Sequence, residues 1–139
     1  PAIPGDANTI DKFPFASDAF GTASDVGDIT LVKRQMSGQS SKTHGYLSGG
    51  VESGTPTEVN VIEKFPFATD TNSTDVGDLV LALQAPQEQS SREFGYASGG
   101  DDGTTDVGMI QRFPFATDTN ASDVGSLTVA RSQGAGAQD

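Results

Sequence analysis

Apolar and polar side chains alternate along several short stretches of the chain. In the middle third of the sequence, apolar residues occupy odd-numbered positions at Val59, Val61, Phe65 and Phe67. The last third repeats this pattern at Val107, Met109, Phe113 and Phe115. Residues 29–31, 79–81 and 127–129 alternate in the same way. A period of two is typical of β-strands that bury one face. The pattern therefore predicts an all-β chain of short strands, each with one well-buried face.

Three blocks of sequence recur at nearly constant spacing. They lie at residues 10–16, 62–68 and 110–116, at residues 24–29, 74–79 and 122–127, and at residues 44–50 and 94–100. The period is about 50 residues, which is typical of four-stranded propeller blades of the kelch kind. We divide the chain into repeats at 1–50, 51–100 and 101–139, with the first incomplete at its N-terminus and the last incomplete at its C-terminus.

The connections between the predicted strands carry turn-forming residues. Asp, Asn, Ser and Thr fill residues 70–75 and 118–123, as in turns closed by side-chain hydrogen bonds. The glycine pairs at 49–50 and 99–100 permit positive φ or a close backbone approach at a strand end. The proline in each Phe-Pro-Phe cannot donate a hydrogen bond to a neighbouring strand, so it indicates a strand end, an edge or a bulge.

The order of these blocks resembles a kelch repeat: a tyrosine strand ending in Gly-Gly, a loop, an aromatic strand, a turn and an apolar strand. The tryptophan of that family is absent, and Ile29, Leu79 or Leu127 lies in its region. Residues 9–132 also resemble, more closely, a repeat of structural proteins of marine cyanobacterial phages. This second resemblance implies a virion-associated protein of a tail fibre or surface decoration, and it implies no chemistry.

The number of repeats has a consequence for assembly. The chain holds about 2.8 repeats, whereas closed propellers have about four to eight blades. Each repeat buries its face only against a neighbour, so open ends need partners. We therefore expect the blades to be completed by oligomerisation or by a longer chain, and an open stack of β-repeats is the alternative to a ring.

Composition excludes several classes of protein. With 19 acidic and 8 basic residues the net charge is −11, which argues against nucleic acid as a partner, and the absence of cysteine excludes a disulfide scaffold or a cysteine-ligated metal. No apolar run approaches the roughly 18 residues of a membrane-spanning helix. Residues 1–5 have neither the basic nor the apolar region of a signal peptide. We expect no membrane partner.

One turn has the spacing of a calcium loop. Its oxygen-bearing residues are Asp70, Asn72, Thr74 and Asp78. Calcium prefers six to eight oxygen ligands, several of them charged. The third copy has Ser126 in the last position, and the first copy carries two extra residues. A hydrogen-bonded turn explains the same residues, so we expect no metal here, and a calcium-stabilised module remains the alternative.

No catalytic or cofactor site is expected. The single histidine, His44, is replaced by Phe94 in the next repeat, which favours a structural role over a general base or metal ligand. The aromatic columns Phe13/Phe65/Phe113 and Phe15/Phe67/Phe115 alternate along strands, which favours core positions over sugar stacking. No Ser–His–acid set recurs in the repeats.

The sequence thus predicts a non-enzymatic structural or interaction protein, located on a virion or outside the cell, that presents variable loops. Its expected partners are other copies of itself or neighbouring virion proteins, with a host surface glycan as a further possibility. The alternative is a calcium-stabilised adhesin or glycan-binding module. An enzyme would need its unique groups on blades outside this chain.

Overall fold

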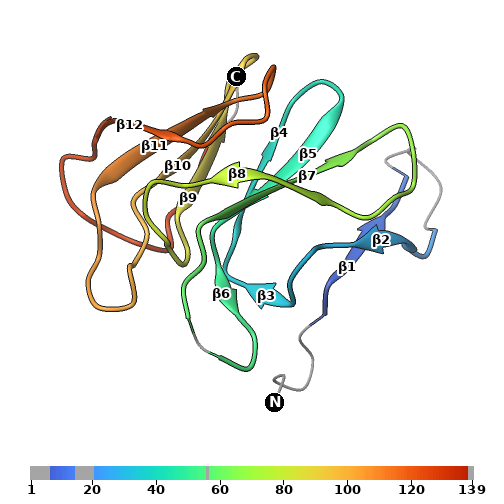
Figure 1. Ribbon diagram of the computed structural model, residues 1–139, viewed down its shortest axis with the longest axis horizontal. Coiled ribbons are helices and arrows are strands. Elements are labelled where there is room, and N and C mark those ends of the chain that lie inside the picture. Colours follow the sequence, from blue (N-terminus) through green and yellow to red (C-terminus); the bar gives the residue numbers. More distant parts are fainter. Residues whose placement is uncertain (1–6, 15–20, 56, 138–139) are drawn as a thin grey trace.

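The chain folds into antiparallel sheets joined by loops (Figure 1). The computed structural model describes residues 7–14, 21–55 and 57–137, and this part of the chain is all-β, without helices. It consequently holds no helix of the length and apolar character needed to cross a membrane. The all-β fold class is confirmed.

Four sheets make up the described part of the fold. The hairpin consists of β1 (Thr9–Lys12) and β2 (Ser24–Asp28). The central sheet consists of β4 (Ser37–Ser40), β5 (His44–Ser48), β7 (Val61–Pro66) and β8 (Thr74–Asp78). The C-terminal sheet consists of β9 (Gln87–Ser90), β10 (Phe94–Ser98), β11 (Met109–Pro114) and β12 (Ser122–Ser126). Two short strands, β3 (Lys33–Arg34) and β6 (Val51–Glu52), pair with each other.

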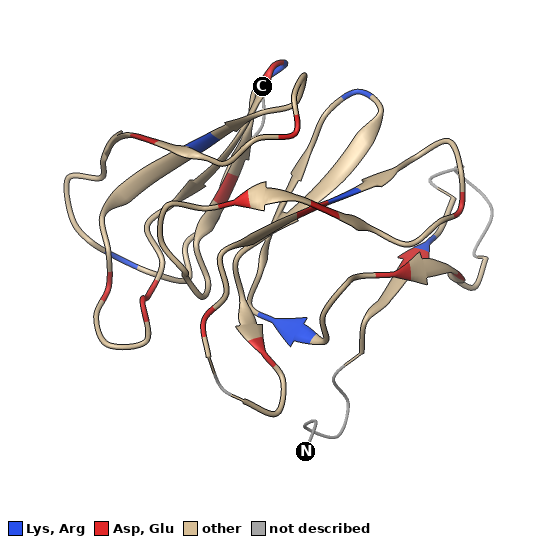
Figure 2. Ribbon diagram, in the orientation of Figure 1, with Lys and Arg blue, Asp and Glu red and all other residues tan. Residues whose placement is uncertain are grey.

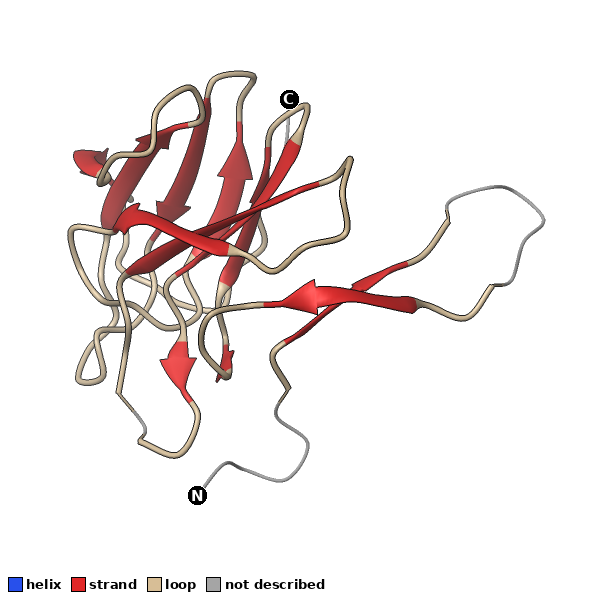
Figure 3. Ribbon diagram, turned by 45° about the vertical axis from the view of Figure 1, so that its right-hand side comes forward, coloured by secondary structure: helices blue, strands red, loops and turns tan. Residues whose placement is uncertain are grey.

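The two four-stranded sheets are structural copies. Strand order follows chain order in both, and the registers match, since His44 lies opposite Pro66 and Phe94 lies opposite Pro114. The sheets span residues 37–78 and 87–126, so each combines the end of one sequence repeat with the beginning of the next. The hairpin corresponds to the last two strands of such a sheet, and Figure 3 shows it extending away from the rest of the molecule.

The third strand of each copy contains an irregularity. The pairing register shifts between Ile62 and Glu63 in β7, as it does between Ile110 and Gln111 in β11. Ile62 and Glu63 are consecutive, and both are buried. The expectation of one buried face per strand is therefore wrong for β7, because this strand lies between the hairpin on one side and the C-terminal sheet on the other. The prolines end β7 and β11, as predicted.

The hydrophobic core lies between the central and C-terminal sheets. Its buried members are Tyr46, Ile62, Leu79, Ala97 and Phe113. The first strands of the two sheets, β4 and β9, also lie side by side. A polar cluster joins them: Gln39 Nε2 donates to the carbonyl oxygen of Tyr96 at 3.0 Å, and the amide of Ser40 donates to Ser90 Oγ at 3.0 Å. The sheets are thus held by apolar packing and by hydrogen bonds.

Candidate functional site

Successive sheets meet through the same contacts, so the chain contains two versions of one interface. We call the contact between the hairpin and the central sheet the first interface, and the contact between the central and C-terminal sheets the second interface. Two polar contacts recur. The amides of Asp28 and Asp78 donate to Asn72 Oδ1 and Asn120 Oδ1, each at 3.1 Å. The lysine Nζ atoms of Lys12 and Lys64 approach Asp70 Oδ1 and Asp118 Oδ1, at 3.1 and 2.6 Å.

An aromatic cluster fills the second interface. The ring of Tyr46 stacks on Phe115 with centroids 4.7 Å apart and lies tilted against Phe113 at 5.6 Å. Its hydroxyl group donates to the carbonyl oxygen of Phe115 at 3.4 Å. Tyr46 is 3% exposed, and this burial raises the pKa of its hydroxyl group. The tyrosine of the Gly-Tyr strand therefore fills the space between the central and C-terminal sheets.

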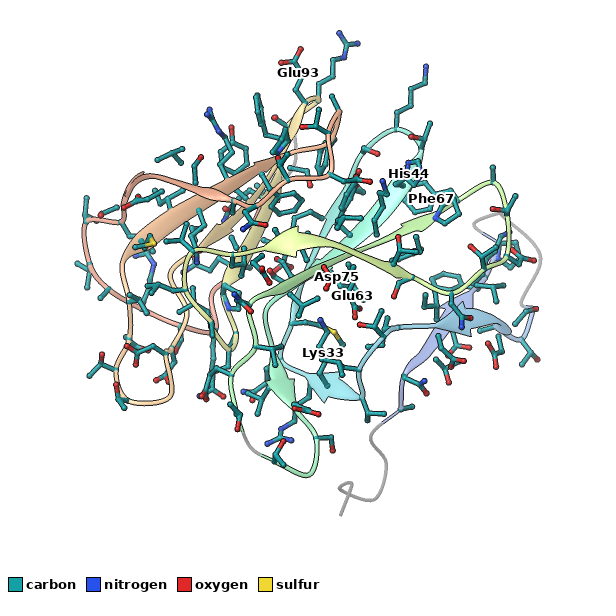
Figure 4. All side chains as sticks on the ribbon, in the orientation of Figure 1. Lys33, His44, Glu63, Phe67, Asp75 and Glu93 are labelled. Atoms are coloured by element: carbon teal, nitrogen blue, oxygen red, sulfur yellow. The ribbon has the colours of Figure 1, made fainter. Side chains whose placement is uncertain are left out.

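The corresponding place in the first interface is an open groove. We define the groove by its apolar lining residues Ile10, Phe13, Val26, Phe65 and Phe67, which surround a cavity of about 380 Å³. Phe67 is 48% exposed (Figure 4) and Phe13 is 55% exposed, because no tyrosine strand precedes β1 in the described part of the chain. Exposed aromatic side chains around a cavity are a candidate binding site.

A buried ion pair lies beside this interface. Lys33 Nζ is 3.7 Å from Glu63 Oε2, and both side chains are fully buried (Figure 4). Glu63 Oε1 accepts hydrogen bonds from the amide of Thr30, at 3.0 Å, and from its hydroxyl group. Burial lowers the pKa of Lys33, and the charge of Glu63 partly offsets this effect.

The second interface replaces this ion pair with neutral residues. Leu83, which is fully buried, takes the place of Lys33, and Gln111 takes the place of Glu63. Gln111 Oε1 accepts a hydrogen bond from the amide of Leu81 at 3.0 Å, as Glu63 does from Thr30. The sequence reasoning did not single out this pair. A signal was present in the sequence, since both positions change together between repeats.

The turn with calcium-loop spacing is used for contacts between sheets. Asp70 pairs with Lys12, and Asn72 Oδ1 accepts a backbone hydrogen bond from the hairpin. Thr74 and Asp78 are the first and last residues of β8. In residues 7–14, 21–55 and 57–137 there is no group of three or more Asp, Glu, His or Cys side chains arranged to hold a metal ion.

We expect Asn120→Ala to lower the free energy of unfolding by about 1 kcal/mol, because the amide of Asp78 loses its acceptor. Asn120→Asp keeps an acceptor oxygen and should lose less. Urea denaturation followed by circular dichroism measures both variants.

Millimolar calcium or a chelator should leave the melting temperature of the parent chain unchanged, and a rise with calcium would instead support the metal-binding alternative.

His44 begins β5 at the end of the central sheet, where its Nδ1 lies 2.9 Å from Thr43 Oγ1. Its counterpart Phe94 begins β10, and the guanidinium carbon of Arg112 lies 4.4 Å from the centre of the Phe94 ring. His44 and Phe94 thus make different local contacts, although they begin equivalent strands of the two sheets. The Lys, Arg, Asp and Glu residues are spread over strands and loops alike (Figure 2).

The aromatic columns are buried only where a neighbouring sheet covers them. Phe113 is 2% exposed and Phe115 packs against the core, so the core prediction is confirmed for these two residues. It is wrong for Phe13 and Phe67, which are exposed beside the groove, and Phe65 is only half-buried there. Phe15 lies outside the described residues. What the arrangement offers chemically is an apolar binding surface that is bordered by the charged side chains of Asp11, Lys12 and Asp70.

In comparisons with known proteins, no family model and no curated protein matches this chain.

Proposed function

We propose that this chain is a non-enzymatic structural repeat module whose kelch-like, propeller-type blades dock end to end with neighbouring modules and present variable loops to a partner. The setting that the resemblance to phage structural proteins implies is a virion tail fibre or surface decoration. The partners would then be other copies of the chain, neighbouring virion proteins or a host surface glycan.

The observation that carries this proposal is the exposure of repeated residues at the C-terminal end. Ile29 and Leu79, which another sheet follows, are 5% and 2% exposed. Beyond the last sheet, Val124 and Val129 are 44% and 65% exposed, although their counterparts in the preceding repeats are half-buried. Burying such side chains stabilises a protein by about 1.5–3 kcal/mol each, so this face favours a further sheet.

Charges at the two ends of the chain are complementary. Arg131 occupies the repeat position of Lys33, and Asp11 occupies the position of Glu63. Both are exposed, at opposite ends of the repeat array. Docking the C-terminal sheet of one copy onto the hairpin of the next would bring them together as Lys33 and Glu63 are brought together. The net charge of −11 opposes other, unspecific contacts between copies.

The loop that would face a partner is held by hydrogen bonds within the loop. Asp102 Oδ1 accepts hydrogen bonds from the amides of Thr104 and Thr105, each at 2.9 Å, and from the Thr104 hydroxyl group at 2.6 Å. These hydrogen bonds lower the pKa of Asp102. The corresponding loop of the preceding repeat differs in sequence, so each repeat offers a different surface on the same scaffold.

We expect the mass measured by light scattering after size exclusion to rise with concentration above the 14.3 kDa of one chain. Arg131→Glu and Asp11→Lys should each weaken this association because like charges then meet, and the double variant should restore it. Val80→Glu, at a residue outside both ends, is the matched control. A mass that stays at one chain up to millimolar concentration would contradict end-to-end docking.

A further inference from the structure

The groove lies beside a strand with an open edge. Within the described residues, β1 pairs with β2 alone, whereas β7 and β11 each have a neighbour on both sides. The missing neighbour of β1 corresponds to β5 and β10, the two strands that carry Gly-Tyr. An open edge next to an apolar groove is the arrangement that binds an extended peptide as an added strand.

The central sheet shows how such a strand would pair with β1. In the pairing of β5 with β7, Tyr46 lies opposite Lys64 and Gly45 lies opposite Phe65. A Cβ atom on Gly45 would overlap the ring of Phe65, so this position requires glycine. The same register on β1 places a tyrosine opposite Lys12 and a glycine opposite Phe13.

The groove is already shaped for the tyrosine ring. At the second interface, where Tyr46 is bound, the rings of Phe113 and Phe115 are 5.9 Å apart at an angle of 78°. At the groove, the rings of Phe65 and Phe67 are 6.1 Å apart at the same angle of 78°. The ion pair of Lys12 with Asp70 also forms without a bound strand. A preformed site binds without the cost of rearranging its walls.

We propose that the groove binds a β-strand of the Gly-Tyr type, donated by another polypeptide, which pairs with the open edge of β1 and packs its tyrosine ring against Phe65 and Phe67. We choose this occupant because the equivalent place in the second interface is filled by Tyr46 of such a strand. The proposal goes beyond the docking of whole modules, because Val129 and Arg131 take no part in the groove.

The test uses the 139-residue chain and a fluorescein-labelled peptide of residues 42–52, which carries Gly45 and Tyr46. Fluorescence anisotropy should show saturable binding. The Tyr46→Ala peptide should bind about tenfold more weakly or worse, because it loses the buried aromatic side chain. The Gly45→Ala peptide should also bind more weakly, since its methyl group meets the ring of Phe13.

Protein variants locate the binding site. Phe67→Glu should abolish peptide binding, whereas Val80→Glu should leave it unchanged. The two residues are equally exposed, at 48%, so both variants are expected to fold, and only Phe67 lines the groove. Arg131→Glu should not alter peptide binding, which separates this proposal from end-to-end docking of modules.

Three results would overturn the proposal: no binding up to millimolar peptide, equal binding of the Tyr46→Ala peptide, or unchanged binding by Phe67→Glu. A fourth result would also overturn it: a dimer that Phe67→Glu dissociates and the peptide fails to displace, because a surface of a second copy other than a Gly-Tyr strand would then occupy the groove.

Discussion

Lys33→Leu should lower the free energy of unfolding by about 3–5 kcal/mol, because it leaves the carboxylate of Glu63 buried without its counter-charge. This is a large part of the roughly 5–15 kcal/mol that stabilises an ordinary domain. Glu63→Gln alone should also be destabilising, since it leaves the Lys33 ammonium group buried. Urea denaturation of each variant gives the two values.

The second interface supplies the control for this experiment. Lys33→Leu combined with Glu63→Gln reproduces the Leu83 and Gln111 pair that the chain already uses. The double variant should regain most of the lost stability, because the introduced glutamine side chain can still accept the hydrogen bond from the amide of Thr30 and no charge stays buried. Strictly additive losses in the double variant would mean that the two side chains do not act as a pair.

Gly49→Ala should lower the free energy of unfolding by about 2–4 kcal/mol. Gly49 has φ of 67°, and a Cβ atom there would lie 2.6 Å from the carbonyl oxygen of Leu83. That oxygen accepts the hydrogen bond of the Gly50 amide at 2.8 Å, so the backbone cannot withdraw without breaking this contact. The added methyl group would thus press on residues 79–86, the segment that joins the central sheet to the C-terminal sheet.

Gly38→Ala is the matched control for Gly49→Ala, since a Cβ atom on Gly38 meets nothing within 4 Å. Its effect on the free energy of unfolding should stay within about 0.5 kcal/mol. Thermal and urea denaturation measure both variants. Equal stability of the Gly49 and Gly38 variants would show that the linker yields to the added methyl group.

Local features of this fold could be predicted from the sequence. Alternation located the aromatic strands β7 and β11, but it was wrong for residues 29–31, 79–81 and 127–129, where the chain bends directly after β2, β8 and β12. Pro66 and Pro114 marked strand ends, and the positive φ of the Gly-Gly pairs was expected from their place after a strand. Each of these depends on a residue and its immediate chain neighbours, because proline and glycine act directly on backbone geometry.

Features that depend on distant neighbours could not be predicted. Phe67 and Phe115 stand in the same sequence context, yet the first is exposed and the second packs against Tyr46. The burial of both Ile62 and Glu63 likewise depends on distant neighbours, because the C-terminal sheet covers one face of β7 and the segment that follows the hairpin covers the other. The groove became visible only when the two interfaces could be compared.

The exchange of an ion pair for neutral residues between the two interfaces has a consequence for folding. Near-identical repeats invite misassembly, in which a strand joins the wrong copy of its partner. If β7 and β11 exchanged places, Lys33 would meet Gln111 and Leu83 would meet Glu63, so each interface would bury one lone charge. The correct arrangement buries none. The energetic cost of a buried lone charge at these four side chains therefore favours the correct order of the repeats, which the similar strand sequences around them do not distinguish.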